Sequence, residues 1–276
     1  MKSIIKIIII KIGWLFNKLI NNLFGYRIAD SILNFKVEEK RKIQINNIDI
    51  YLHTPNFLLR YRHKTFFSKE PETLNWIDGF NPNSIFFDIG ANVGLYSIYA
   101  ALKKDMKVFA FEPSFFNLEF LARNIFRNDL NDKINILPIA LNDKNGLNDF
   151  HLTSTEWGGA LSTFEMNYDD SGNEMHPEFI YKTIGFSLDS IVKILNISQP
   201  DYIKIDVDGL EHIILSGAKE VLKEVKEILV EINDNFYTQS ENTKIILTDL
   251  NFYLEQKIYT EKVNRPIANQ IWKKIK

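Results

Sequence analysis

Four acidic side chains follow short apolar runs of the kind that form buried strands. They are Asp88, Glu112, Asp206 and Glu231. If these runs are strands of one open parallel sheet, their carboxyl ends meet at the edge where such sheets bind ligands. Carboxylates gathered there can accept hydrogen bonds from hydroxyl groups, hold a cation or take up a proton. The sequence therefore predicts a ligand site with acidic walls.

The first of these acids opens a tight turn. Residues 88–94 read D-I-G-A-N-V-G and lie between an apolar run and a helical pattern. This order differs from the G-x-G-x-x-G fingerprint that binds a pyrophosphate, which argues against a nicotinamide oxidoreductase. A turn with an acid and few glycines suits a ligand that has no phosphate and carries a positive charge. S-adenosylmethionine meets both conditions, and we expect it to be bound by Asp88, Gly90, Asn92 and Gly94.

The second acid follows the first at the distance along the chain that is expected of a ribose-binding acid. Residues 108–111 form an apolar run that Glu112 and Pro113 end. In dinucleotide-binding folds an acid at the end of the second strand bonds the ribose hydroxyls. A carboxylate has two acceptor oxygens for a vicinal diol, so we expect Glu112 to bind the adenosyl ribose. The simpler alternative is that Asp88 caps a helix and Glu112 is a solvated strand end.

The remaining two acids are candidates for catalysis. Because side chains alternate along a strand, Lys204, Asp206 and Asp208 are predicted to share one face. Burying a lysine in an apolar strand is costly unless it is paired, and Asp206 or a neighbouring acid is the expected partner. The candidate catalytic residues are Asp206, Glu211 and Glu231.

A hydroxyl acceptor needs help to lose its proton, and the sequence offers two ways. A general base is one, and His212 is the histidine beside the acids. The other is Mg²⁺, for which Asp206, Glu231 and Asn233 are possible oxygen ligands. Trp157, followed by two glycines, is either an apolar wall of the acceptor site or an ordinary loop residue.

The order of elements predicts an α/β fold. Strands alternate with helical patterns from residue 81 onward, which indicates a Rossmann-like, mostly parallel seven-stranded sheet with helices on both faces and an antiparallel C-terminal edge strand. The third strand, at 134–137, is expected to run on to residue 141. Residues 147–185 break the periodicity and are expected to be an insertion over the cleft.

Composition limits the classes of protein that remain. The 276 residues are 45% hydrophobic and 25% charged, as in a globular protein, with a net charge of −2 that gives no polycationic surface for nucleic acid. The absence of cysteine excludes disulfides, a thiolate metal site and a cysteine nucleophile. The simplest location is the cytoplasm. We expect a catalytic domain at 81–276 after an extension, 1–80, with a hairpin at about 35–61 and a helix at 70–77.

The first 24 residues are rich in isoleucine and contain Lys2, Lys6, Lys11 and Lys18. No lysine-free run approaches the roughly 20 apolar residues that span a bilayer, and no signal-peptide pattern is visible. We expect a helix that packs on the domain or forms a homodimer, in preference to one that rests on the inner face of the membrane.

Together these motifs resemble the FkbM family of S-adenosylmethionine-dependent methyltransferases. The likeness covers about residues 75–232 and includes the motifs at 88–97, 111–117, 140–143, 187–191, 204–211 and 230–231. It implies a class I methyltransferase fold with Pro113 and Asn117 at the cofactor and Ala140 or Asp143 near the adenine. Asp208 stands where the family usually has Glu, which leaves a direct role for it open.

The resemblance also implies the reaction. The family methylates hydroxyl groups, often on a sugar of a glycan or a glycosylated metabolite, so we expect an O-methyltransferase of polysaccharide biosynthesis acting on a small-molecule or glycan acceptor. Two alternatives stay open: N-methylation of an amino sugar, and a binding module that has lost turnover. The buried acids argue against the second alternative.

Overall fold

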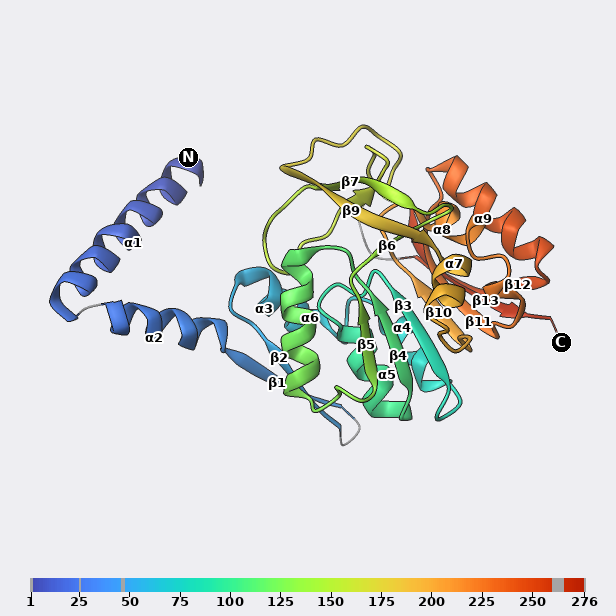
Figure 1. Ribbon diagram of the computed structural model, residues 1–276, viewed down its shortest axis with the longest axis horizontal. Helices are drawn as coiled ribbons and strands as arrows, with labels where there is room; N and C mark the ends of the chain where they lie inside the picture. The colour runs from blue at the N-terminus through green and yellow to red at the C-terminus, as the bar shows by residue number, and fades with distance from the viewer. Residues whose placement is uncertain (1, 25, 46–47, 260–265, 276) are drawn as a thin grey trace.

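The computed structural model describes residues 2–24, 26–45, 48–259 and 266–275, and a seven-stranded sheet lies at its centre (Figure 1). The strand order is β12-β13-β11-β10-β3-β4-β5, and β13 runs antiparallel to both of its neighbours. This is the predicted α/β fold. The strands are β3 (Ile85–Ile89), β4 (Lys107–Phe111), β5 (Ile134–Leu137), β10 (Tyr202–Ile205), β11 (Glu227–Asn233), β12 (Phe252–Tyr259) and β13 (Ile267–Lys274).

The central strands are apolar throughout because both faces of the sheet are covered. Phe86 and Phe87 are adjacent in β3 and fully buried, but they enter different cores on opposite faces, as alternation requires. The helices on the Phe86 face are α4 (Pro71–Asp78), α5 (Leu95–Lys104) and α6 (Phe115–Arg127). Those on the Phe87 face are α7 (Leu188–Ile194), α8 (Glu211–Ser216), the 3₁₀ helix η1 (Val221–Lys223) and α9 (Tyr237–Asp249).

The N-terminal extension contains two long helices and a shorter hairpin than expected. The elements are α1 (Lys2–Phe24), α2 (Tyr26–Val37), β1 (Lys40–Ile45), β2 (Ile48–His53) and α3 (Phe57–Thr65). Helices thus occupy both ends of the predicted hairpin segment, and Asn56 caps α3 by accepting a hydrogen bond from the Leu59 amide. Ile50 and Phe66 pack in the same core as Ile98, so this core continues across residue 80.

Figure 1 shows α1 and α2 standing clear of the body, which they join at the hairpin. None of the helices in the described part of the chain combines the length and apolarity of a membrane span.

The third strand is shorter than predicted, and the segment after it forms a second sheet. β5 ends at Leu137 because Pro138 has no N–H to donate to a neighbouring strand. Residues 140–141 belong instead to a sheet of order β6-β9-β7-β8. Its strands are β6 (Ala140–Asn142), β7 (Gly146–Leu152), β8 (Ser162–Phe164) and β9 (Phe179–Ser187).

Packing in the second sheet predicts opposite effects for two glycines. A Cβ at Gly185 would lie 2.3 Å from the buried ring of Phe164, whereas at Gly146 the nearest atom is the Asn148 Nδ2 at 3.8 Å. Gly185→Ala should therefore lower the free energy of unfolding by about 1–3 kcal/mol, and Gly146→Ala should leave it unchanged or raise it slightly. Urea unfolding measures both; equal midpoints for the two variants would contradict this packing.

Candidate functional site

A cavity of about 510 Å³ opens at the carboxyl ends of the central strands. Gly90 and Asn92 line it from the turn after β3, Glu112 and Pro113 from the end of β4, and Asp206 from the end of β10. This is the edge at which open α/β sheets bind ligands, and its volume is within the range of cofactor pockets. Glu231 of β11 also lines the cavity. The structure thus brings three of the four predicted acids together there: Glu112, Asp206 and Glu231.

Glycine is required where the turn after β3 meets the end of β10. Gly90 has a φ of 81°, and a Cβ there would lie 1.9 Å from the backbone oxygen of Asp206. Gly94, with a φ of 85°, precedes α5 and has the side chain of Leu121 where its Cβ would be, at 2.6 Å. Gly90 lines the cavity. Gly94 does not line it and is the residue at which helix α5 is capped.

The Glu112 carboxylate joins this turn to the end of β4. Its oxygens accept hydrogen bonds from the amides of Asn92 and Ser114, each at 2.8 Å. Burial raises the pKa of Glu112 to about 7 in spite of these bonds. The Asn117 side chain is a further hydrogen-bond partner of this carboxyl, and its remaining lone pairs can accept from a ligand. The position expected of a ribose-binding acid is thus filled by a fixed, buried carboxyl on the cavity wall.

The Asp88 side chain contacts helix α5 through Ser97. It is buried, does not line the cavity and accepts a hydrogen bond from the Ser97 hydroxyl at 2.5 Å. Burial raises its pKa. Asn92, by contrast, lines the cavity, and its side-chain oxygen is buried with no hydrogen-bond partner in the protein. A buried acceptor of this kind is a place for a donor group of a ligand.

A loop covers the turn and is held there by the asparagines expected at the cofactor. The side-chain amides of Asn92 and Asn117 donate to the Gly159 oxygen at 2.7 and 3.2 Å, and the Gly158 amide donates to Asn117 Oδ1 at 3.1 Å. Trp157 packs on Phe120 and does not line the cavity, so it is not the predicted acceptor wall. Gly159 and the residues that follow it line the cavity in its place.

Helix α3 holds the same loop from the other side. Arg62 donates from Nε and Nη2 to the Gly158 oxygen, at 2.9 and 2.6 Å, and Asn56 donates to the Trp157 oxygen at 2.9 Å. The loop is therefore clamped between the N-terminal extension and the turn.

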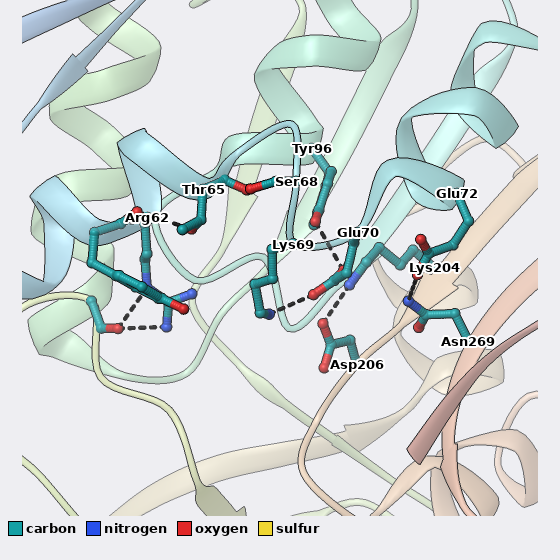
Figure 2. A network of polar contacts seen from close by, with 12 residues as sticks. Arg62, Thr65, Ser68, Lys69, Glu70, Glu72, Tyr96, Lys204, Asp206 and Asn269 are labelled. Carbon is teal, nitrogen blue, oxygen red and sulfur yellow. Dashed lines mark hydrogen bonds and ion pairs between the residues drawn. The ribbon is translucent and has the colours of Figure 1, made fainter. Parts of the chain in front are cut away.

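The predicted ion pair of Lys204 with Asp206 is confirmed, with Nζ 2.7 Å from Oδ2 (Figure 2). Burial lowers the pKa of Lys204, but the carboxylates of Asp206, Glu70 and Asp88 outweigh burial and hold that pKa above its ordinary value. The ammonium also lies over the Tyr96 ring, 5.1 Å from its centroid. A buried cation thus fixes the Asp206 carboxylate at the cavity wall.

Figure 2 also shows how the extension joins this network. Tyr96 donates to one oxygen of the buried Glu70 at 2.9 Å, and Lys69 pairs with the other. Lys69 lines the cavity beside Asp206. Charged groups from outside the predicted catalytic domain therefore surround the strand-end acids.

The predicted common face of Lys204, Asp206 and Asp208 is wrong for the last residue. β10 ends at Ile205, and Asp208 has a φ of 58°, so strand alternation no longer applies. Its carboxylate accepts from the Leu161 and Ser162 amides at 2.7 and 3.3 Å. Asp208 nevertheless lines the cavity, and burial raises its pKa to about 6.

Two further predicted site residues, besides Asp88 and Gly94, do not line the cavity. The buried Glu211 accepts hydrogen bonds from the Val207 and Gly209 amides and from the Gln239 side chain, and it does not line the cavity. Its position supports a structural role in the turn after β10 in place of the catalytic role expected. Asp143 is exposed and also outside the lining, whereas Ala140 lines the cavity.

The expected Mg²⁺ site is not supported. The described residues contain no group of three or more His, Cys, Asp or Glu side chains able to hold a metal. Asn233, the third expected ligand, donates to the Asp170 oxygen and the Ser171 hydroxyl and accepts from the Asn235 amide. His212 lies outside the cavity lining, against the Phe236 ring.

Several cavity residues were missed from the sequence. Leu58, Tyr61, Arg62 and Lys69 come from the extension, where no motif marks them. The insertion contributes a second group, residues 159–162 with Phe150, Phe164 and Asp170, and this confirms that it lies over the cleft. The polar run at 167–173 was the available signal for Asp170.

The strand order, the antiparallel β13 and the position of the cavity define a class I methyltransferase fold. The family model of the methyltransferase FkbM domain matches residues 88–257, more than half of the chain. The protein belongs to the FkbM methyltransferase family.

Solved structures of methyltransferases are similar to the chain at low sequence identity. An rRNA methylase from Streptococcus thermophilus is 12% identical, with a TM-score of 0.47, over 74% of this chain and 95% of that one. Precorrin-6y C5,15-methyltransferase from Geobacter metallireducens is 15% identical, with a TM-score of 0.44, over 75% and 87%. We find no significant match among curated proteins.

The buried carboxyls predict how stability depends on pH. The pKa values of Glu112 and Glu211 are raised to about 7 and that of Asp208 to about 6, from ordinary values of 4.5 and 3.8. The folded chain then binds these protons more tightly than the unfolded chain, so this contribution to stability is complete below about pH 4 and is lost as pH rises through 6 to 7. The melting temperature should fall between pH 5 and pH 8.

Thermal melts across that pH range measure the effect. Glu211→Gln should flatten the slope because glutamine does not titrate, and Glu165→Gln, at a carboxyl whose pKa is lowered by Lys144, serves as the control. A melting temperature that rises toward pH 8 would contradict the raised pKa values.

Proposed function

We propose that the protein binds S-adenosylmethionine in this cavity and transfers the methyl group to a hydroxyl of a sugar, in a glycan, a cell-surface polysaccharide or a glycosylated metabolite. The observation that carries the proposal is the meeting of three features in one cavity: the Gly90 turn, the Glu112 carboxyl and the Asp206 carboxylate. Membership of the FkbM family supports methyl transfer as the reaction.

The walls of the cavity suit the parts of this cofactor. Glu112 presents acceptor oxygens for the two ribose hydroxyls, and the unpartnered oxygen of Asn92 can accept a further hydrogen bond. Phe111, Ala140 and Leu141 supply an apolar slot for the adenine ring. When bound, S-adenosylmethionine supplies a methyl group on a positively charged sulphur.

The charge of the lining also suits a cation. The acidic lining residues outnumber the basic ones. The acids are Glu112, Asp170, Asp206, Asp208 and Glu231, and the bases are Arg62 and Lys69. A cleft lined by one sign of charge concentrates ligands of the opposite sign. A sulphonium with an amino group is therefore favoured over a phosphate-bearing dinucleotide.

The acceptor is proposed to lie on the side of Asp170, Asp206 and Glu231. Carboxylates accept hydrogen bonds from sugar hydroxyls and can position one of them for attack. Removal of the hydroxyl proton by a base contributes about 10²–10⁴ in rate. Asp206 is the first choice for the base because Lys204 fixes its carboxylate. Asp208 is the second, because a pKa of about 6 is close to neutral pH.

N-methylation of an amino sugar is a second candidate, and the same acidic wall favours it. An ammonium group would bind among these carboxylates, and one of them would have to take its proton before transfer. The site of the methyl group in the product separates the two reactions.

Calorimetry tests the cofactor. S-adenosylmethionine should bind and NAD should not, and Glu112→Gln should weaken binding about tenfold to a hundredfold through the loss of hydrogen bonds to a charged group. Glu165→Gln is the control, since Glu165 does not line the cavity. Binding of NAD in place of S-adenosylmethionine would overturn the proposal.

Turnover is tested by screening glycan and amino-sugar extracts for products that gain one methyl group in mass spectrometry. With an acceptor found, Asp206→Asn should lower kcat at least about a hundredfold while the affinity for S-adenosylmethionine stays near normal. Asp208→Asn run in parallel identifies the base. Near-normal kcat in both variants would remove these carboxyls from the reaction, and binding without any methylated product would favour a non-catalytic module.

A further inference from the structure

Helix α1 exposes far more apolar surface than a helix that is only solvated. Eight large apolar side chains between Ile7 and Leu19 have 49–61% of their surface exposed. Figure 1 shows that α1 stands away from the sheet and its helices and adjoins α2. An exposed apolar surface of this extent marks a site of interaction with a partner or a membrane.

The apolar side chains of α1 have a regular arrangement. Ile8, Ile12, Leu15 and Leu19 recur at spacings of four, three and four residues, which places them in one stripe along the helix. Asn17 and Asn21 lie on the opposite side at 100° per residue. Ile10 lies on that side as well, between the two asparagines, so the helix has one continuous apolar stripe and an opposite side of mixed polarity, and the stripe is the face suited to an interface.

Lysines lie at the margin of the apolar stripe. Lys11 and Lys18 are seven residues apart and share a face next to it. The Lys18 ammonium lies 5.2 Å from the centre of the Trp14 ring, and that ring is 61% exposed. Tryptophan and lysine at the edge of an apolar face occupy the headgroup level of a bilayer, because each has an apolar body and a polar tip.

The net charge of the N-terminal segment indicates which kind of partner its apolar stripe binds. Residues 1–37 contain six basic side chains and one acidic side chain, Asp30, although the whole chain has a net charge of −2. Residues 1–29 contain no acid at all. Two α1 helices packed stripe against stripe would bring lysines together with no acid of α1 to neutralise them. The phosphate groups of an anionic lipid surface would neutralise Lys11 and Lys18, which lie beside the stripe.

We propose that α1 docks the protein on an anionic lipid bilayer, lying along the surface with the stripe of Ile8, Ile12, Leu15 and Leu19 toward the acyl chains. Four lysines within 23 residues keep the helix on the surface and out of the bilayer core. The docking concerns a face remote from the cavity and holds whatever the acceptor is.

Vesicle sedimentation of the full-length chain tests the docking. The protein should pellet with vesicles of equal parts phosphatidylcholine and phosphatidylglycerol at least tenfold more than with phosphatidylcholine alone, and the difference should shrink as salt is raised. The pair Lys11→Glu and Lys18→Glu should abolish it. The matched pair Lys144→Glu and Lys182→Glu, whose side chains are each 62% exposed on the body, should retain it.

A second variant separates lipid from a second copy of the chain. Ile12→Asn with Leu15→Asn should also lose vesicle binding, and circular dichroism checks that both variants stay folded. Analytical ultracentrifugation without lipid should give a monomer for the parent and the variant alike. A parent dimer that this variant dissociates, or equal pelleting with both kinds of vesicle, would overturn the proposal.

Discussion

The close contact between the turn after β3 and the end of β10 is the constraint on which the site depends. A side chain at position 90 would overlap the Asp206 backbone oxygen, so the two strand ends can meet only through glycine. That contact places the Asn92 amide where Glu112 can accept its hydrogen bond, and Glu112 in turn fixes the end of β4. A single close contact between two backbone segments therefore positions one side of the cavity, and buried carboxyl groups lie around that contact.

The site is completed by parts of the chain that carry no recognisable motif. Arg62 clamps the loop at Gly158, and Glu70 ties Tyr96 to the charged groups around Asp206. Both residues precede the segment that matches the FkbM model. The extension therefore forms a wall of the cavity as well as part of the hydrophobic core.

The sequence predicted the features that depend on local patterns. Apolar runs, glycine spacing and the strand-end acids defined the central sheet and placed Asp206 and Glu112 on one cavity. The second sheet was missed because β6 pairs with β9, whose residues lie more than forty positions away, and no local pattern encodes that pairing. Glu211 was a candidate for catalysis because it follows Asp206 closely in the sequence. In the structure its carboxylate accepts from the Val207 and Gly209 amides after the turn at Asp208, whose φ is positive.

The most direct measurement is a crystal structure of the protein with S-adenosylhomocysteine. Our account predicts the ribose hydroxyls within hydrogen-bonding distance of the Glu112 carboxylate, the adenine beside Ala140 and the sulphur facing the Asp206 side of the cavity. Electron density for the ligand at another place, or a cavity that stays filled by protein side chains at saturating ligand, would contradict it.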